Sequence, residues 1–194
     1  MKYPVCCCCA ESNQRYYLDR ILFWAGQFYA MNYDLHVFCD GNIVEDVSIL
    51  KKAGISFHEY EKLGRNSSWV FQSYKRNFLM MCKMFPNGFS VVENDVVIFN
   101  MKKFDEYTRK DGLFCGFSKK YNFIETAMMI LNDKDAIERF IQHYENDGAI
   151  YENECFECTL KKVANKKFDS VFTGERKEGD ATFDITRDYC AQFF

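Results

Sequence analysis

The sequence predicts an α/β fold in which a mixed sheet is flanked by helices and the first half of the sheet is parallel. Two observations predict this fold class. Over residues 1–100, short apolar runs alternate with longer segments whose apolar residues recur every three or four positions, the order expected of parallel strands joined by helical crossovers. After residue 100 the order becomes irregular, which indicates antiparallel strands added to the parallel half.

The predicted strands of the first half are short apolar runs bounded by polar residues. The first is buried and ends at a polar segment, and the second ends at the turn signal Asp40-Gly41-Asn42. Two further runs, separated by three polar residues, complete the parallel half. These strands cover Tyr3–Cys9, Leu35–Cys39, Ser56–Tyr60, Ser90–Val92 and Val96–Phe99.

The helices between these strands are predicted from apolar residues at helical spacing. Ser12 or Asn13 caps the first helix, which extends to about Tyr33; the second begins near Ile43 and stops at Gly54. The third ends at Pro86-Asn-Gly88, and 61–68 is expected to be a loop. The inward residues are Leu18, Ile21, Leu22, Ala25 and Phe28 in the first helix, Val47, Leu50 and Ala53 in the second, and Phe71, Tyr74, Phe78, Met81, Cys82 and Phe85 in the third.

The second half contains weaker patterns. Four short strands and two helices are expected, one helix capped by Asp133 and ended by Asp147-Gly148, the other covering Asn153–Ala164. The strands are Leu113–Phe117, Thr126–Leu131, Ser170–Thr173 and Thr182–Ile185; the inward residues are Ile137, Phe140, Ile141 and Tyr144 in the first helix and Phe156, Leu160 and Val163 in the second.

Composition restricts the classes of protein that the chain can represent. Its 194 residues, 48% of them hydrophobic, suffice for one domain with a large core, and we expect a single domain over residues 1–194. A net charge of −3 with scattered Lys and Arg does not predict a nucleic-acid partner. No stretch reaches the ~18–20 apolar residues of a membrane span. The N-terminus lacks a signal-peptide core, so a cytoplasmic protein is expected.

Ten cysteines raise the question of disulfides or a zinc site. Without an export signal, reduced thiols are expected. Cys6 to Cys9 are consecutive, and neighbours on a strand face opposite sides, unlike zinc ligands spaced C-x₂₋₄-C. We interpret them as small apolar residues of a buried strand. Cys155 and Cys158 have zinc or redox spacing but no second suitable pair, which favours simple thiols.

An acidic motif, Glu93-Asn94-Asp95, lies between two apolar runs and predicts a metal site. On extended backbone, side chains two apart point the same way, so Glu93 and Asp95 would converge while Asn94 faces away. Two carboxylates are suitable ligands for Mg²⁺ or Mn²⁺. The alternative interpretation is a tight polar turn between two strands, where Asn and Asp are common.

These residues together resemble the GT-A glycosyltransferases. That family carries a D-x-D motif after a hydrophobic strand of a Rossmann-like half, and Glu93-Asn94-Asp95 is similar to its E-x-D variant. Val37-Phe-Cys-Asp-Gly41 resembles a strand that ends in Asp-Asp-Gly, and Lys75-Arg76-Asn77 resembles the family's Ala-Arg-Asn. The matches span about residues 3–100. They depart from the family's pattern in the Glu of the motif and in the single Asp at position 40.

The resemblance implies a nucleotide-sugar donor, UDP-sugar being the expected one, across the carboxyl ends of the parallel strands. Residues 1–100 would bind the donor and 101–194 a glycan or other hydroxyl acceptor. Donor contacts would come from Ala10, Glu11, Asp40, Arg76 and Asn94, and Mn²⁺ or Mg²⁺ would be held by Glu93 and Asp95. Arg76 could equally be a solvated residue opposite the apolar face of its helix.

The resemblance also suggests a general base for an inverting transfer, near the start of a late helix. Glu154 and Glu157 are the candidates. Glu157 could instead form a surface pair with Lys161, four residues later. His143 has no further ligand type at useful spacing after it and is not expected to bind metal, and His36 and His58 are expected in strands. The small size allows the chain to be one module of a longer protein.

Two other classes of function compete with this prediction. A sugar nucleotidyltransferase also begins with a Rossmann-like half, but it carries a Gly-rich basic loop after its first strand, and Cys9-Ala-Glu-Ser-Asn-Gln14 has no glycine. A non-catalytic nucleotide-sugar-binding module would keep the fold without turnover. Retention of both acidic residues argues against it.

Overall fold

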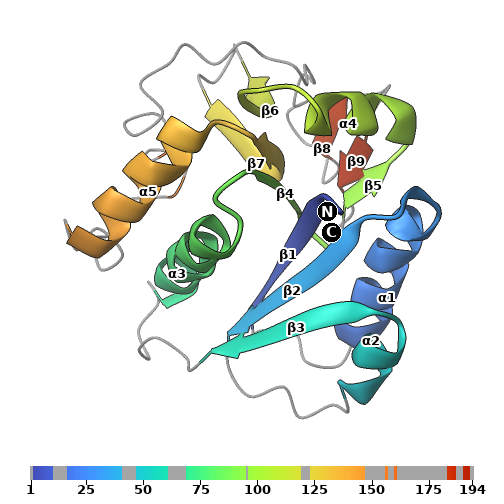
Figure 1. Cartoon of the computed structure of the whole chain (residues 1–194). Helices are drawn as coiled ribbons and strands as arrows, with labels where there is room; N and C mark the ends of the chain where they lie inside the picture. The colour runs from blue at the N-terminus through green and yellow to red at the C-terminus, as the bar shows by residue number, and fades with distance from the viewer. Residues whose placement is uncertain are drawn as a thin grey trace.

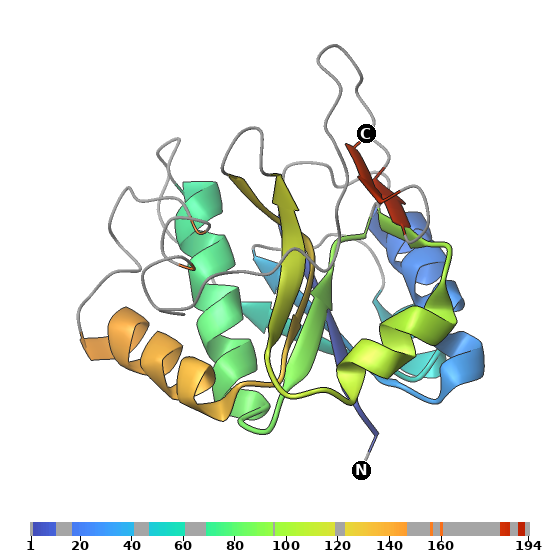
Figure 2. The same ribbon diagram turned by 90° about the horizontal axis from the view of Figure 1, so that it is seen from above.

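A computed structural model describes residues 2–10, 17–40, 47–60, 69–94, 96–118, 123–146, 183–186 and 190–192, together with Phe156 and Leu160. A six-stranded mixed sheet has helices on both faces (Figures 1 and 2). Helices α3 and α5 cover one face, while α1, α2 and α4 cover the other. The predicted fold class, an α/β fold with a parallel first half, is confirmed.

The sheet has the strand order β3-β2-β1-β4-β7-β6. Strands β1 to β4 are parallel, β7 is antiparallel to β4, and β6 is antiparallel to β7. The strands cover Pro4–Ala10 (β1), Asp34–Asp40 (β2), Ile55–Tyr60 (β3), Phe89–Val92 (β4), Leu113–Ser118 (β6) and Phe123–Leu131 (β7). The chain progresses outward from β1 to β3 and then returns to the other side of β1 with β4. The strand order therefore reverses between β1 and β4.

A second, three-stranded sheet lies beside the first and has the order β5-β9-β8. Its strands are Val96–Ile98 (β5), Phe183–Thr186 (β8) and Cys190–Gln192 (β9). Strand β8 matches the predicted strand 182–185, and β9 was not predicted. Because β9 pairs with β5, the end of the chain is brought next to the segment that follows the acidic motif. The predicted strand 170–173 lies outside the described residues.

The helices match the predicted periodicity, with differences at their ends. They cover Tyr17–Phe28 (α1), Ser48–Lys52 (α2), Trp69–Met84 (α3), Met101–Thr108 (α4) and Lys134–Asn146 (α5), with a short 3₁₀ turn at Tyr29–Met31 (η2). Helix α1 and its 3₁₀ turn stop before the predicted Tyr33, because Asn32 adopts a left-handed conformation with φ 55°. Gly54 (φ 74°) follows α2 as predicted, but Ala53 is exposed rather than inward.

Helix α4 was not predicted. Its sequence MKKFDEYT is mostly polar and offers few apolar positions. It begins at Asn100, whose side chain accepts a hydrogen bond from Lys103 N (3.1 Å), and it buries Phe104 and Thr108. The predicted cap of α5 is confirmed, because Asp133 Oδ1 accepts a hydrogen bond from Ala136 N at 3.0 Å.

The sheet has a hydrophobic core on each face, and successive residues of a strand point alternately into one core and the other. Cys6 and Cys8 belong to the core under α3 and α5, whereas Cys7 and Cys9 belong to the core under α1, α2 and α4. The predicted alternation of the four cysteines across β1 is thus confirmed. Trp24 of α1, which was not assigned to the apolar face, is fully buried because it completes the stripe of Ile21 and Phe28.

The late helix is described only at Phe156 and Leu160, which are helical and buried as predicted. Phe156 packs on α3, with its ring centroid 4.7 Å from that of Phe78 and 4.9 Å from that of Tyr74. No helix within the described ranges has the length and apolar character needed to cross a membrane.

Candidate functional site

The reversal of strand order defines a binding position at the carboxyl ends of β1 and β4. In open α/β sheets, ligands bind in the crevice outside the carboxyl ends of the strands at such a switch point. Ala10, the last residue of β1, is in register with Asp40 of β2, and Asp40 is in register with Tyr60 of β3. Two predicted donor-binding residues and Tyr60 thus form a row across three strands at this edge. Glu11 lies outside the described residues.

The acidic motif is a turn rather than a continuation of the strand. Glu93 N donates a hydrogen bond to Ala127 O of β7 (2.9 Å), and Val96 N donates one to Glu93 O (3.1 Å). This second bond closes a four-residue turn over residues 93–96. This bond matches the tight turn of the alternative interpretation, and the convergence of the Glu93 and Asp95 side chains stays a prediction. Glu93 and Asn94 are half-buried, and Asp95 is outside the described residues.

Asn94 connects this turn to the end of β1. Its Nδ2 donates a hydrogen bond to Cys9 Sγ at 3.8 Å. Cys9 itself is 4.0 Å from Cys7, measured between the two Sγ atoms, on the same face of β1. The turn is thereby fixed beside the switch point, where a donor is expected to bind.

The raised pKa values of two cysteines of β1 also indicate that Glu93 is close to this strand. The hydrogen bond with Cys9, then burial and the charges of Cys9, Cys8 and Glu93 raise the pKa of Cys7 well above its usual value. Burial first, and then charges that include Glu93, raise the pKa of Cys8 in the same direction. These thiols stay protonated at neutral pH, so they are poor candidates for nucleophiles or metal ligands.

Arg76 lies near the same edge of the sheet. Its guanidinium carbon is 5.1 Å from the centroid of the Tyr60 ring, a cation–π contact with the last residue of β3. Its Nε and Nη2 atoms are shielded from solvent. Arg76 is half-buried rather than fully solvated, and its contact with the donor stays a prediction.

Lys75 is a residue that the sequence reasoning did not select as a candidate. It is fully buried, three residues before Phe78 and seven before Cys82 on the stripe of α3 that faces the sheet. A buried ammonium group is costly unless other groups compensate its charge, so such residues are concentrated at functional sites. Its spacing from Phe78 and Cys82 is the signal that could have identified it.

The candidate bases Glu154 and Glu157 lie outside the described residues. Phe156 and Leu160, on the same segment, contact α3, the helix that carries Arg76. The assignment of either Glu as a base stays a prediction.

The histidines of β2 and β3 form a structural cluster. His36 Nδ1 is 3.0 Å from His58 Nε2, and His36 Nε2 is 3.1 Å from Asp34 Oδ2. The two rings are stacked, and Phe85 packs edge-on against His36. Both histidines are strand residues, as predicted, and they lie before the carboxyl ends of their strands rather than in the row of Ala10, Asp40 and Tyr60.

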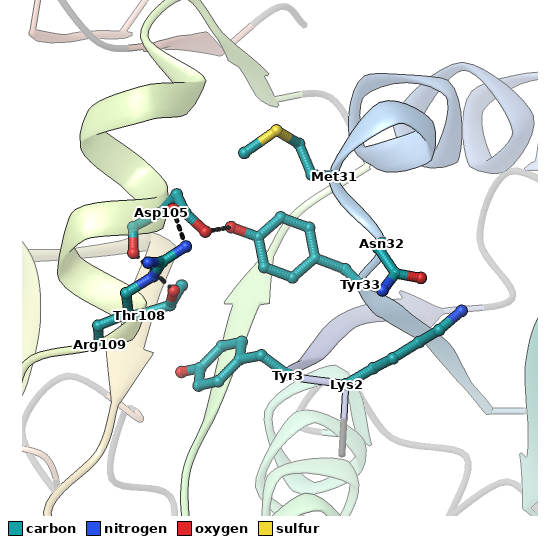
Figure 3. A pocket seen from close by; sticks show the side chains of 8 residues that line it. All are labelled: Lys2, Tyr3, Met31, Asn32, Tyr33, Asp105, Thr108 and Arg109. Carbon is teal, nitrogen blue, oxygen red and sulfur yellow. Dashed lines mark hydrogen bonds and ion pairs between the residues drawn. The ribbon is translucent and has the colours of Figure 1, made fainter.

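A cavity of about 450 Å³ opens at the other end of the sheet, where strands β1 and β2 begin (Figure 3). Tyr3 and Tyr33 line it just before β1 and β2 begin, together with Asp105 and Arg109 of the α4 region. The carboxylate of Asp105 accepts hydrogen bonds from Tyr33 Oη (3.0 Å) and Arg109 Nη2 (2.6 Å). Because it lies at the amino ends of the strands, this cavity is not the predicted donor site.

Metal ligation was predicted for Glu93 and Asp95. Among the described residues, no group of three or more His, Cys, Asp or Glu side chains is arranged to hold a metal ion, and Asp95 is not one of these residues. Mg²⁺ and Mn²⁺ take oxygen ligands and complete their shell with water or phosphate, so metal binding by Glu93 and Asp95 stays a prediction.

Comparison with known proteins gives similarity at the level of the fold. No protein-family model matches the sequence, and no curated protein matches it. The glycosyltransferase GlyE of Streptococcus pneumoniae TIGR4 superposes with a TM-score of 0.58 at 9% identity, covering 88% of this chain and 45% of that chain. The chain therefore spans less than half the length of GlyE.

A second solved structure is similar over nearly the full length of both chains. The CTP:phosphocholine cytidylyltransferase LicC of Streptococcus pneumoniae superposes with a TM-score of 0.56 at 9% identity, covering 100% of this chain and 94% of that chain. The chain thus shares a Rossmann-like α/β fold with GlyE and LicC.

Proposed function

We propose that the chain is a metal-dependent glycosyltransferase that moves a sugar from a nucleotide-diphosphate donor, a UDP-sugar, to a hydroxyl group of a glycan or another acceptor. The observation that supports this most is the position of the acidic turn. Glu93 and Asn94 are at the carboxyl end of β4, and Asn94 is hydrogen-bonded to Cys9 near the carboxyl end of β1. This is the switch point of the sheet, where nucleotides bind in such folds.

Each candidate residue has a role in donor binding. Ala10, Glu11 and Asp40 follow or end the first two strands and would contact the base and ribose. Arg76, beside Tyr60, would face the diphosphate, since a guanidinium group suits phosphate oxygens. Glu93 and Asp95 would hold the metal ion.

Glu93 and Asp95 would hold a divalent ion that, when bound, would stabilise the negative charge on the departing nucleoside diphosphate. In an inverting reaction, Glu154 or Glu157 would take the proton of the acceptor hydroxyl while its oxygen attacks the anomeric carbon. The bond from that carbon to the diphosphate oxygen breaks, and the diphosphate carries away the electron pair. The transition state has oxocarbenium character, as in glycoside hydrolysis.

The nucleotidyltransferase LicC favours a second candidate function, because its length matches that of this chain more closely than the length of GlyE does. The segment Cys9-Ala-Glu-Ser-Asn-Gln14 argues against it, because it contains no glycine.

A binding screen distinguishes these functions. UDP-sugars, CTP and other nucleoside triphosphates are each tested for thermal stabilisation with and without Mn²⁺. Ligand in hundredfold excess over Kd stabilises the folded state by about 2.7 kcal/mol. A clear shift with UDP-sugar and Mn²⁺ supports the proposal. A shift with CTP alone favours nucleotidyl transfer, and no shift with any nucleotide contradicts both.

A further inference from the structure

The side chain of Gln27 forms two hydrogen bonds with the backbone of β5. Gln27 Nε2 donates to Val96 O at 2.9 Å, and Gln27 Oε1 accepts from Ile98 N at 2.8 Å. Gln27 is the penultimate residue of α1, and the two partners are about seventy positions later in the chain. Figures 1 and 2 show α1 and β5 side by side.

The amide of Gln27 takes the place of a neighbouring strand. The carbonyl of one residue and the N–H of the second residue after it point to the same edge of a strand, and a parallel neighbour bonds to both. The opposite edge of β5 is occupied by β9, where Val97 is in register with Ala191. Gln27 therefore satisfies backbone groups on the side of β5 that β9 does not reach.

Val96 also belongs to the acidic turn. Its N–H closes the turn on Glu93 O (3.1 Å), while its carbonyl is held by Gln27. The other end of the turn is fixed by the bond from Glu93 N to Ala127 O. The turn is thus held by β7 where it begins and by α1 where it ends, so a shift at Val96 would move the residues between them.

We propose that Gln27 is a positioning residue for the nucleotide–metal site: it fixes the end of the turn and thereby the position of Glu93 and Asn94. This inference depends on the proposed function, because it assumes that the turn binds a metal–diphosphate complex. Gln27 itself touches neither metal nor donor. Sequence periodicity gives no signal for this role, because it does not reveal that α1 packs beside β5.

The test compares Gln27→Met with the parent. Methionine has a similar length but neither donates nor accepts these hydrogen bonds. A matched control is Gln142→Met, at an exposed position of α5. Binding of UDP is measured by calorimetry, with and without Mn²⁺, at a temperature well below the melting temperature of each variant.

We expect Gln27→Met to raise the Kd of UDP in the presence of Mn²⁺ about tenfold. A change of this size corresponds to the net contribution of one hydrogen bond that holds the turn in its binding conformation. The weak binding of UDP without Mn²⁺ should not change, and Gln142→Met should bind like the parent. A purely structural role would lower the melting temperature and leave Mn²⁺-dependent binding in the folded protein unaltered.

A second variant, Gln27→Glu, keeps the acceptor for Ile98 N–H but loses the donor to Val96 O. It should weaken Mn²⁺-dependent binding as Gln27→Met does, and it provides the measurement if the Met variant does not fold. If the parent binds UDP with Mn²⁺ and both Gln27 variants bind equally well, the positioning role is wrong while the proposed function stands. If the parent does not bind, the proposed function fails and the inference fails with it.

Discussion

Asn94 and Cys9 meet across the switch point of the sheet, with Asn94 Nδ2 3.8 Å from Cys9 Sγ. The contact joins the acidic turn after β4 to β1. Strand β1 lies in the middle of the sheet, with β2 and β3 on one side and β4, β7 and β6 on the other. A bound nucleotide would lie against both strands.

Metal and donor should bind cooperatively, and Asp95→Asn should abolish this effect. Two carboxylates leave most of the coordination shell to water or phosphate, so Mn²⁺ and UDP-sugar should each bind weakly alone. Together they should raise the melting temperature clearly in the parent and not in Asp95→Asn.

Without ligand, Asp95→Asn should be as stable as the parent or more stable, because it removes repulsion between two acidic groups. If instead the variant unfolds and the parent shows no response to the donor, the motif is a structural turn and the glycosyltransferase proposal is wrong.

Glu154→Gln and Glu157→Gln test the general base. The variant that lacks the base should lose transfer activity by about 10²–10⁴-fold, since proton removal from the acceptor contributes about that much. Donor affinity should be retained, as measured by calorimetry with UDP and Mn²⁺. Full transfer activity in both variants would show that neither residue is the base.

The cysteines should bind no zinc and react slowly with thiol reagents. Seven cysteines in the described part of the chain carry free thiols, at positions 6–9, 39, 82 and 115, and Cys6, Cys7 and Cys9 are at most 3% exposed. Burial raises the pKa of Cys115 to about 12, so its thiolate is scarce at neutral pH. Metal analysis of the purified protein should find no zinc, and one tightly bound zinc per chain would overturn the prediction.

The His36–His58 pair should make stability depend on pH. Burial first, and then the charge of His36, lower the pKa of His58 below the usual histidine value of about 6.5. The unfolded chain therefore binds more protons than the folded one near and below this pH. The contribution of His58 is fully present above pH ~6.5 and is lost as pH falls toward its lowered pKa.

The measurement is the melting temperature between pH 7.5 and 5.5. His58→Gln should show a smaller decrease over this range than the parent, whereas the control His143→Gln, on α5, should decrease as the parent does. Identical pH profiles for His58→Gln and the parent would rule out His58 as the source of the dependence.

The sequence by itself determined the elements whose apolar residues repeat regularly. Cys6 to Cys9 alternate across β1, and Ile21 and Phe28 lie on the buried face of α1, because a strand or helix must turn its apolar residues toward a core whatever its neighbours are. The same patterns predicted the parallel half of the sheet and thus the edge where Ala10 and Asp40 lie in register. Helix α4 was not predicted, because its mostly polar sequence has few apolar residues at helical spacing.

Only the tertiary structure decided which elements are neighbours. The turn at Glu93–Val96 is held by Ala127 of β7 and Gln27 of α1, and β5 forms a strand against β9 from the end of the chain. Lys75 is fully buried although its side chain is charged, and packing rather than composition decides this. Periodicity shows which face of an element is apolar, but the hydrogen bonds that shape the candidate site join backbone and side-chain groups distant in sequence, and their partners are set by packing.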